Sequence, residues 1–260
     1  IDFVLNLNSG TINLSTMALV PSVCSSMNIP CIPCDATAIV TGEHKLLSNC
    51  IAKSIGLNVP KTLNKNDSNG IFRPINLGNS MGVKRGFDEQ TDGIYQEFIE
   101  GYDITTPVVY NPAKKAMDLL PTVIYLPKSN DSQWYNSENA KKKRNGYDLG
   151  IIKIDEKLKR KYIELAEILS INTFCRIDAR VKSVTANRDI KTVDFNNAYF
   201  VEINVMPTIR EFNNFVFSYN SIKSYESFAE YKKSYENVFG ISNIHNFLLS
   251  VSMLSSKTMC

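Results

Sequence analysis

Apolar and polar residues alternate along residues 199–207, and this pattern predicts a β-strand. Glu202 and Asn204 occupy polar positions of the segment. Because side chains two residues apart lie on the same side of a strand, these two residues are expected to share one face. The opposite face is expected to carry Val201, Ile203 and Val205.

A second alternating segment, residues 174–181, also predicts a strand. Its charged positions are Arg176, Asp178 and Arg180, and its apolar positions are Cys175, Ile177, Ala179 and Val181. If the two strands are neighbours, Asp178, Glu202 and Asn204 converge on one site. Carboxylate and amide oxygens suit a hard cation such as Mg²⁺. The alternative is an amphipathic surface hairpin whose charged side chains are solvated.

Two further features would suit a phosphate site. Arg176 shares the expected face of Asp178, and oxygen ligands beside a fixed cation are what phosphoryl transfer needs, because its catalysis is mainly positioning and charge stabilisation. The glycine-rich turn from Gly78 to Gly82 lies between two predicted strands, where its backbone N–H groups can hold phosphate oxygens. The alternative for this turn is an ordinary hairpin connection.

The first part of the chain predicts strands and helices in alternation. Residues 3–7 and 29–33 are short predicted strands, with a helix expected between them over residues 15–27. This order indicates a parallel pair. Further helices are predicted over residues 43–55 and from Asp155, as the cap, to Leu169. The succession of elements predicts an α/β protein.

Composition and charge exclude some classes of function. The 260 residues can bury a substantial core and are expected to form two or three subdomains. Hydrophobic residues make up 43% and charged residues 21%, as in ordinary globular proteins. The net charge of +3 is too small to argue for nucleic acid or a membrane surface. No apolar run is long enough to span a bilayer, so neither partner is expected.

The six cysteines do not form a metal-binding pattern. Cys31 and Cys34 are a close pair, and the histidines are His44 and His245. A zinc site would need a second such pair or nearby histidines. A redox role for Cys31 and Cys34 is an alternative, but ordinary strand or loop positions are favoured. Free cysteines are typical of reducing compartments, so a cytoplasmic location is expected.

The two alternating segments resemble the metal-binding strands of the ATP-grasp family, and most closely those of its D-alanine–D-alanine ligase branch. The matching sequences are CRIDARV and VEINVMP. The resemblance implies that Asp178, Glu202 and Asn204 bind magnesium, with two ions expected. It also implies that Arg176 steadies the transferred phosphate as a catalytic residue.

The resemblance implies a fold as well. In an ATP-grasp fold the nucleotide sits between two α+β subdomains, here preceded by a partial α/β subdomain. The expected ranges are 1–42 for the N-terminal subdomain, 43–101 for the central subdomain with the phosphate-binding turn, and 102–260 for the C-terminal subdomain with the metal and substrate site. Family members have a further strand–helix unit before residue 1, so the true N-terminus is expected upstream.

Several residues match phosphate-binding positions of the family. By this match Lys45 contacts the nucleotide phosphates, and Ser80 covers them together with the glycine-rich turn. Arg73 replaces a family lysine and keeps its positive charge. In the family a lysine from a loop reaches the γ-phosphate. Lys141 is the expected counterpart, with Lys142 next.

The adenosine part of the nucleotide has its own matches. Gln96 is expected at the edge of the adenine ring, where an amide can both donate and accept. The backbone of Glu97 and Ile99 would read the adenine, and Asp103 would accept hydrogen bonds from the ribose hydroxyls. The alternative is a plain alternating strand with solvated charges.

The resemblance implies an ATP-dependent carboxylate–amine ligase that forms an amide through an acyl phosphate and releases ADP and phosphate. Its substrates would be small-molecule carboxylates and amines, such as amino acids or a peptide, and a homodimer is possible. The alternative is a non-catalytic ATP-binding relative with an interaction or regulatory role. A ligase for a larger carboxylate is a third possibility.

Two departures from the family concern the substrates. The turn around Gly10 lacks the acid that holds the first substrate's ammonium in the family. The residues after Pro207 lack the family's glycine and serine, although Arg210 could hold a carboxylate. These departures argue against D-alanyl-D-alanine as the product and favour another amino acid or a peptide.

Overall fold

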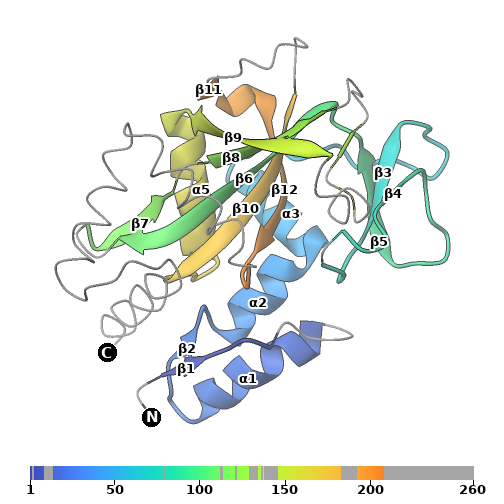
Figure 1. Ribbon diagram of the computed structural model, residues 1–260. Coiled ribbons are helices and arrows are strands. Elements are labelled where there is room, and N and C mark those ends of the chain that lie inside the picture. The colour runs from blue at the N-terminus through green and yellow to red at the C-terminus, as the bar shows by residue number, and fades with distance from the viewer. Residues whose placement is uncertain are drawn as a thin grey trace.

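The computed structural model describes residues 1, 3–8, 14–78, 80–111, 114–120, 122–128, 134–135, 137, 146–182 and 192–207. Within them the chain forms a two-stranded, a three-stranded and a seven-stranded β-sheet together with helices (Figure 1). This arrangement agrees with the expected α/β class. None of the helices in this part of the chain has the length and apolar character needed to cross a membrane.

The large sheet contains both alternating strands. Its members are β6 (Gly101–Asn111), β7 (Ala116–Leu119), β8 (Thr122–Pro127), β9 (Tyr147–Ile154), β10 (Phe174–Lys182), β11 (Thr192–Val193) and β12 (Ala198–Asn204). Their order is β11-β9-β8-β6-β10-β12, with β7 paired to another stretch of β6. All these pairs are antiparallel except β11 with β9. β10 therefore lies between β6 and β12.

The expected pairing of the two alternating strands is confirmed. Asp178 lies opposite Glu202, and Arg176 lies opposite Asn204. The apolar face of β10 is buried in the core, as its alternation predicts, with Cys175, Ile177, Ala179 and Val181 each at most 3% exposed. The pattern of β10 thus places its charged residues on the opposite face of the sheet.

The alternation expected for β12 is wrong at one position. Glu202 and Phe200 face successive residues of β10, which leaves Val201 without an opposite residue. Such a β-bulge reverses the in–out pattern of the strand on one side of it. Phe200 therefore joins Ile203 in the core, whereas Val201 and Glu202 both line a cavity. A period of two residues cannot reveal a bulge, so the sequence pattern put Val201 on the core face.

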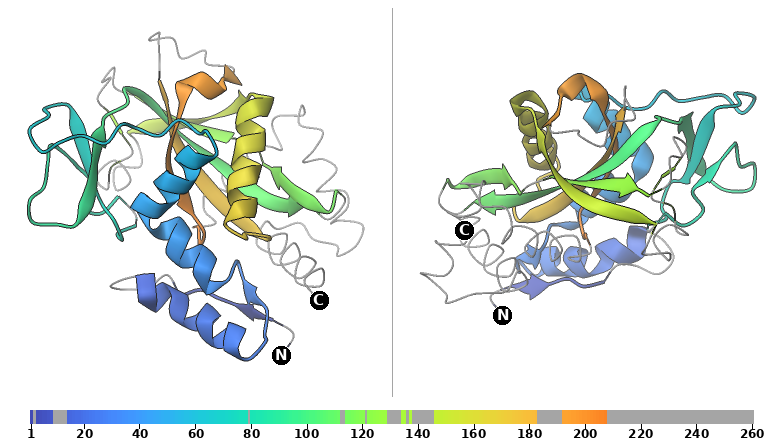
Figure 2. Two further views of the ribbon diagram at one scale, coloured as in Figure 1. Left: turned by 180° about the vertical axis from the view of Figure 1, so that it is seen from behind. Right: turned by 45° about the horizontal axis from the view of Figure 1, so that its top comes forward.

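Two helices cover one face of the large sheet. Figure 2 shows α3 (Lys45–Ser54) and α5 (Glu156–Ile168) lying across this face in the view from behind. Asp155 caps α5 as predicted, because its side chain accepts a hydrogen bond from the backbone N–H of Leu158 at 2.7 Å. The predicted apolar stripe of this helix is buried, and it includes Leu158, Tyr162, Leu165 and Ala166.

The N-terminal unit confirms the expected parallel pair. Strands β1 (Val4–Leu5) and β2 (Cys31–Ile32) are parallel and joined through α1 (Leu14–Ser26). The next helix, α2 (Ala36–Glu43), has no counterpart among the predicted elements. His44 ends α2 and caps the start of α3, so the helix expected from residue 43 begins two residues later.

The buried side of α3 is largely polar, with Ala52 as its apolar member. Lys45, Ser48 and Asn49 are buried, whereas Leu46 and Leu47 are 46% and 40% exposed. Helix α3 packs against β12, the strand that carries Glu202 and Asn204. The polar side chains of α3 therefore face the charged region of the molecule instead of an apolar core.

The three-stranded sheet stands beside the large one (Figure 1). Its order is β4 (Lys84–Arg85), β3 (Gly70–Pro74) and β5 (Gly93–Glu97), all antiparallel. The glycine-rich turn connects β3 to β4, as expected. Gly82 has a φ of +68°, and a Cβ there would lie 2.8 Å from Cγ of Pro74, so this position requires glycine.

We predict that Asp155→Ala lowers the free energy of unfolding by about 1–2 kcal/mol. The substitution removes the cap of α5 and also the acceptor of the Phe195 backbone N–H, which lies 2.6 Å from Oδ2 of Asp155. Urea unfolding followed by circular dichroism measures the change. Arg160→Ala, on the exposed side of the same helix, is the control and should have little effect. Equal stability of the Asp155 variant and the wild type would contradict the capping role.

Candidate nucleotide and metal site

A cavity lies between the three-stranded sheet and the open face of the large sheet. The seven residues expected to bind nucleotide all line it: Lys45, Arg73, Ser80, Gln96, Glu97, Ile99 and Asp103. Arg176, Asp178 and Glu202 line it as well. Asn204 is joined to the cavity through its hydrogen bond to Asp178. The fold thus brings together predicted residues that lie up to 159 positions apart in the sequence (45 to 204).

Asp178 is a carboxylate of this cavity that accepts hydrogen bonds from several side chains. Arg176 donates to both of its oxygens, from Nε at 3.0 Å and from Nη2 at 2.8 Å. Thr105 donates at 2.5 Å and the side-chain amide of Asn204 at 2.9 Å. Burial raises the pKa of Asp178 above its ordinary value, and Arg176 opposes this shift. The carboxylate is therefore held in place by neighbours on β6, β10 and β12.

The same residues fit a magnesium site. The described residues hold no group of three His, Cys, Asp or Glu side chains suited to a metal ion. The candidate set is instead two carboxylates, Asp178 and Glu202, and the amide Asn204. These are oxygen-bearing side chains, which Mg²⁺ prefers over nitrogen and sulfur. The positive charge next to Asp178 in this structure comes from the guanidinium of Arg176.

Lys45 connects the glycine-rich turn to the carboxylates. It begins α3 and is only 5% exposed, so it is not a solvated surface lysine. Its Nζ donates to the backbone carbonyl of Leu77 at 2.7 Å and lies 3.6 Å from a carboxylate oxygen of Glu202. The ammonium group thus stands between the glycine-rich turn and the candidate metal ligands.

Arg73 and Gln96 form a buried polar link across the small sheet. Arg73 donates to the backbone carbonyl of Val201 at 2.9 Å and to the side-chain oxygen of Gln96 at 2.8 Å. Gln96 in turn donates to Asn49 at 3.1 Å and to the carbonyl of Pro60 at 3.0 Å. Burial lowers the pKa of Arg73, while the charge of Glu202 opposes the shift. These bonds tie β3 and β5 to α3 and to the bulge of β12.

The other end of the cavity is formed by the segment that joins the two sheets. We call residues 97–103 the hinge segment. Ile99 of this segment is 7% exposed and lines the cavity together with Phe98 and Tyr135. Asp103 accepts a hydrogen bond from Arg180 at 2.8 Å, so this expected ribose ligand has an arginine partner. Arg180 belongs to the predicted charged face of β10, but the pattern gave no sign of its partners.

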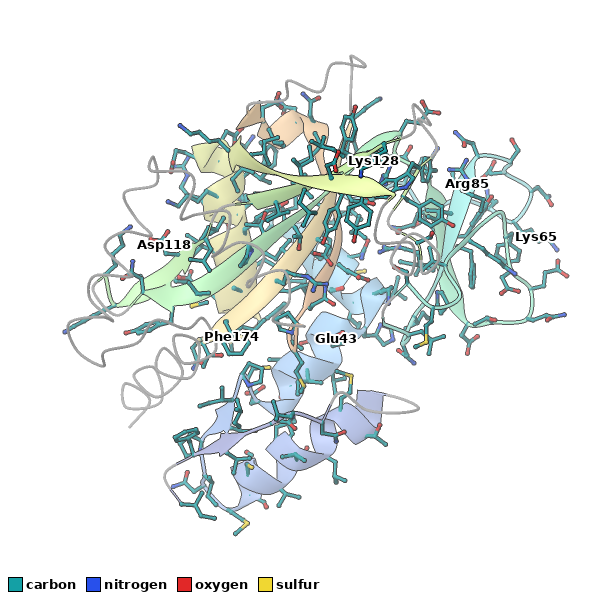
Figure 3. The ribbon with its side chains drawn as sticks, in the orientation of Figure 1. Glu43, Lys65, Arg85, Asp118, Lys128 and Phe174 are labelled. Carbon is teal, nitrogen blue, oxygen red and sulfur yellow. The ribbon has the colours of Figure 1, made fainter. Side chains whose placement is uncertain are left out.

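Sequence reasoning missed Glu43, at the end of α2, where this helix reaches the large sheet (Figure 3). Its carboxylate accepts a hydrogen bond from the backbone N–H of Val205 at 2.9 Å and is also bonded to the backbone of Met206. A Cβ on the preceding Gly42 would lie 2.5 Å from Val205, so helix and strand are in close contact. Thr105 and Asn49 were missed as well, because no periodic signal marks any of these residues.

The remaining expected residues cannot be placed. Lys141, Lys142 and Arg210 lie outside the described residues, and their proposed roles stay predictions. The subdomain boundaries at residues 42 and 101 are likewise expectations.

Ser80, in the middle of the glycine-rich turn, is described and has a φ of +61°. Gly82 in the same turn also has a left-handed backbone conformation. The turn follows Leu77, whose carbonyl accepts the hydrogen bond from Lys45.

Comparisons with known proteins bear on this arrangement. No family model matches the chain. The D-alanine–D-alanine ligase of Aquifex aeolicus is 26% identical over 213 residues, which are 71% of this chain and 66% of that ligase. The chain therefore spans just under two thirds of the length of this curated relative.

Solved structures share the fold. A D-alanine–D-alanine ligase from Bacillus anthracis, solved with ATP, matches with a TM-score of 0.60 over 100% of this chain and 82% of its own, at 16% identity. The ATP-grasp ligase PsnB, solved with a precursor variant, Mg and ADP, matches with a TM-score of 0.51 over 77% of this chain and 62% of its own, at 14% identity.

The large antiparallel sheet, the helices behind it and the small sheet beside it form an ATP-grasp fold. The expected fold class is thus confirmed. The expected resemblance is also confirmed, since the chain is similar in sequence and in structure to D-alanine–D-alanine ligases.

We predict that Glu43→Gln changes the dependence of stability on pH. Burial and the charge of Glu202 raise the pKa of Glu43 from 4.5 to about 7, although Lys45 and the backbone N–H groups of Val205 and Met206 oppose the shift. Between these values the unfolded chain loses the proton first, so the wild-type protein loses stability as pH rises. Glutamine does not ionise, and its oxygen can still accept from Val205.

The stability of Glu43→Gln relative to the wild type should therefore rise between pH 4.5 and pH 7, by up to about 3 kcal/mol, and stay constant above that range. Urea unfolding at a series of pH values measures this difference. A difference that does not vary with pH would show that Glu43 ionises normally in the folded protein.

Proposed function

We propose that this protein is an ATP-dependent carboxylate–amine ligase that forms an amide bond. One observation carries the proposal: Asp178, Glu202 and Asn204 meet beside Arg176 in a cavity that also contains the expected nucleotide residues. Support comes from the relatives, which are named as ligases. The two solved structures contain ATP or Mg and ADP.

In this proposal the triphosphate lies between the glycine-rich turn and the end of β12. Lys45 stands between these two elements, and Arg73 lies next to Val201 on the bulge. Two buried cations in one cavity stabilise a polyanion strongly, because water screens them little there. Arg176 lies within the carboxylate cluster and offers a positive charge to the transferred phosphoryl group.

Asp178, Glu202 and Asn204 would hold magnesium. When bound, the metal would neutralise charge on the phosphates during transfer. The chain's own contribution is to fix these ligands in position. Thr105 fixes one oxygen of Asp178, and Lys45 lies within ion-pair distance of Glu202. Because the two ligand strands are adjacent and antiparallel, the ligands keep their spacing.

The proposed reaction has two steps. A carboxylate oxygen of the first substrate attacks the γ-phosphorus of ATP, the bond to the bridging oxygen breaks, and ADP leaves as an acyl phosphate forms. An amine then attacks the acyl carbon, phosphate leaves with the bonding electron pair, and the amine nitrogen loses a proton. The products are an amide, ADP and phosphate.

We further propose that the substrates are not two molecules of D-alanine. The sequence around Gly10 contains no acid for the first substrate's ammonium. The residues after Pro207 lack the glycine and serine of the family pattern. Another amino acid pair, or a peptide acceptor, is the proposed substrate class.

ADP release tests this function. Protein with Mg²⁺ and ATP is incubated with pairs of L- and D-amino acids, and products are identified by mass. ADP formed with one particular pair would establish the ligase and its substrates. Efficient formation of D-alanyl-D-alanine would contradict the proposed specificity. Firm ATP binding without ADP release, in the presence of peptides and larger acids as well, would favour a binding protein.

We predict that Asp178→Asn and Glu202→Gln each reduce ADP release by at least about 100-fold while the protein stays folded. Both substitutions keep side-chain shape and remove a negative charge that the proposed metal site needs. Asp148→Asn, an exposed carboxylate on β9, is the matched control and should leave the rate unchanged. Turnover at the wild-type rate in either site variant would remove that carboxylate from the mechanism.

We predict that Lys45→Met weakens ATP binding about tenfold, because the ammonium group is buried and aimed at the phosphate-binding turn. Lys53→Met, at an exposed position of the same helix, is the control. Isothermal titration with ATP and Mg²⁺ measures both variants. Equal affinities for ATP in the two variants would contradict a phosphate contact by Lys45.

A further inference from the structure

Arg180, near the end of β10, is the centre of a hydrogen-bond cluster that the proposed chemistry does not use. Its side chain is 7% exposed. Nε donates to the carbonyl of Ile99 at 2.6 Å, Nη2 to the carbonyl of Gly101 at 2.9 Å, and Nη1 to the carboxylate of Asp103 at 2.8 Å. These three partners are alternate residues of the hinge segment. One side chain therefore fixes this segment to the strand that carries Asp178.

The same guanidinium makes two further contacts. Nη2 also donates to the carbonyl of Trp134 at 3.1 Å. The guanidinium carbon lies 4.7 Å from the centre of the Phe98 ring, and that of Arg85 lies 3.9 Å from the same centre. Phe98 also contacts Tyr135 edge to face. Since four of the five N–H groups of Arg180 have partners, its orientation is tightly determined.

The backbone N–H groups at the start of the hinge segment differ in whether they have a hydrogen-bond partner. The N–H of Glu97 donates to Lys61 at 2.8 Å, and that of Phe98 donates to Asn69 at 3.2 Å. For the N–H of Ile99, the described part of the chain provides no hydrogen bond, although the residue is buried and lines the cavity. A buried donor without a partner is unusual and is satisfied by a ligand in many binding sites.

We propose that Arg180 is a positioning residue for the base of the nucleotide: by holding the carbonyl of Ile99, it fixes the N–H of Ile99 for a hydrogen bond to a purine ring. This proposal rests on the proposed function, because it assumes that the cavity binds a nucleotide. A ring nitrogen that accepts a hydrogen bond fits this donor. Adenine has such a nitrogen at N1, whereas guanine carries a hydrogen there. The arrangement therefore favours ATP over GTP.

Arginine is needed for this arrangement because of its shape. Its planar fork donates in several directions at once, whereas the ammonium of lysine is a compact donor on a flexible stem. Asp103 is the one carboxylate that pairs with Arg180 among the described residues. The guanidinium also lies over the ring of Phe98. Removing the guanidinium leaves three backbone carbonyls without this donor and frees the hinge segment from β10.

The test compares the affinity for a nucleotide with that for its phosphate chain alone. We would measure binding of ATP, GTP and inorganic tripolyphosphate, each with Mg²⁺, by isothermal titration to the wild-type protein, Arg180→Met and Arg180→Lys. Arg180→Met should weaken ATP about tenfold (about 1.4 kcal/mol) and reduce the preference for ATP over GTP. Tripolyphosphate should bind with unchanged affinity, because Lys45 and Arg73 are untouched. Arg180→Lys should lose the preference in part.

Arg85→Met is the matched control. Arg85 lies over the ring of Phe98, as Arg180 does, but it is exposed and belongs to β4. Figure 3 labels it. This variant should bind all three ligands within about twofold of the wild type.

Three results would overturn the proposal: unchanged ATP binding in Arg180→Met, equal loss of ATP and tripolyphosphate, or the same losses in Arg85→Met. If Arg180→Met does not fold by circular dichroism, the same comparison in Arg180→Lys decides. A wild-type protein that binds none of the three ligands would instead contradict the proposed function. A wild-type protein that binds ATP and tripolyphosphate equally well would contradict only the role of the base.

Discussion

The antiparallel pairing of β10 with β12 is the constraint on which the rest of the site depends. It sets Asp178 opposite Glu202 and Arg176 opposite Asn204. A buried carboxylate is costly unless it is paired and hydrogen-bonded, and Asp178 meets this requirement with four hydrogen bonds from three side chains. The donors come from β6, β10 and β12. The three adjacent strands and the acidic cluster are thus mutually dependent.

The alternation of β10 organises both ends of the cavity. Arg176 and Asp178 lie at the acidic end, and Arg180, two residues further, lies at the hinge end and fixes the hinge segment. Side chains two residues apart in a strand lie on the same face at a fixed spacing. A single strand therefore sets the distance between the proposed metal site and the proposed base site. On its other face the same strand contributes Cys175 and Ile177 to the core.

Polar contacts help to hold the small sheet and α3 to this strand pair. Lys45 approaches Glu202, Arg73 donates to the bulge at Val201, and Asn49 donates to the same carbonyl at 3.3 Å. Contacts of this kind are strong when water is excluded and weaken when water enters. Binding of a polyanion in the cavity would offer new partners to Lys45, which presently contacts the glycine-rich turn. The positions of the small sheet and of the nucleotide are therefore coupled in our proposal.

The sequence by itself determined the local features. The two-residue period fixed the two faces of β10, the cap at Asp155 fixed the start of α5, and the motif resemblance pointed to the residues that line the cavity. Tertiary structure decided the rest. The bulge at Val201, the carboxylate of Glu43 against the end of β12, and the partners of Arg180 depend on strand register and on contacts between distant segments. Strand register and distant contacts do not appear as a periodicity in the sequence. A pattern of side chains indicates which face is buried and not which partner buries it.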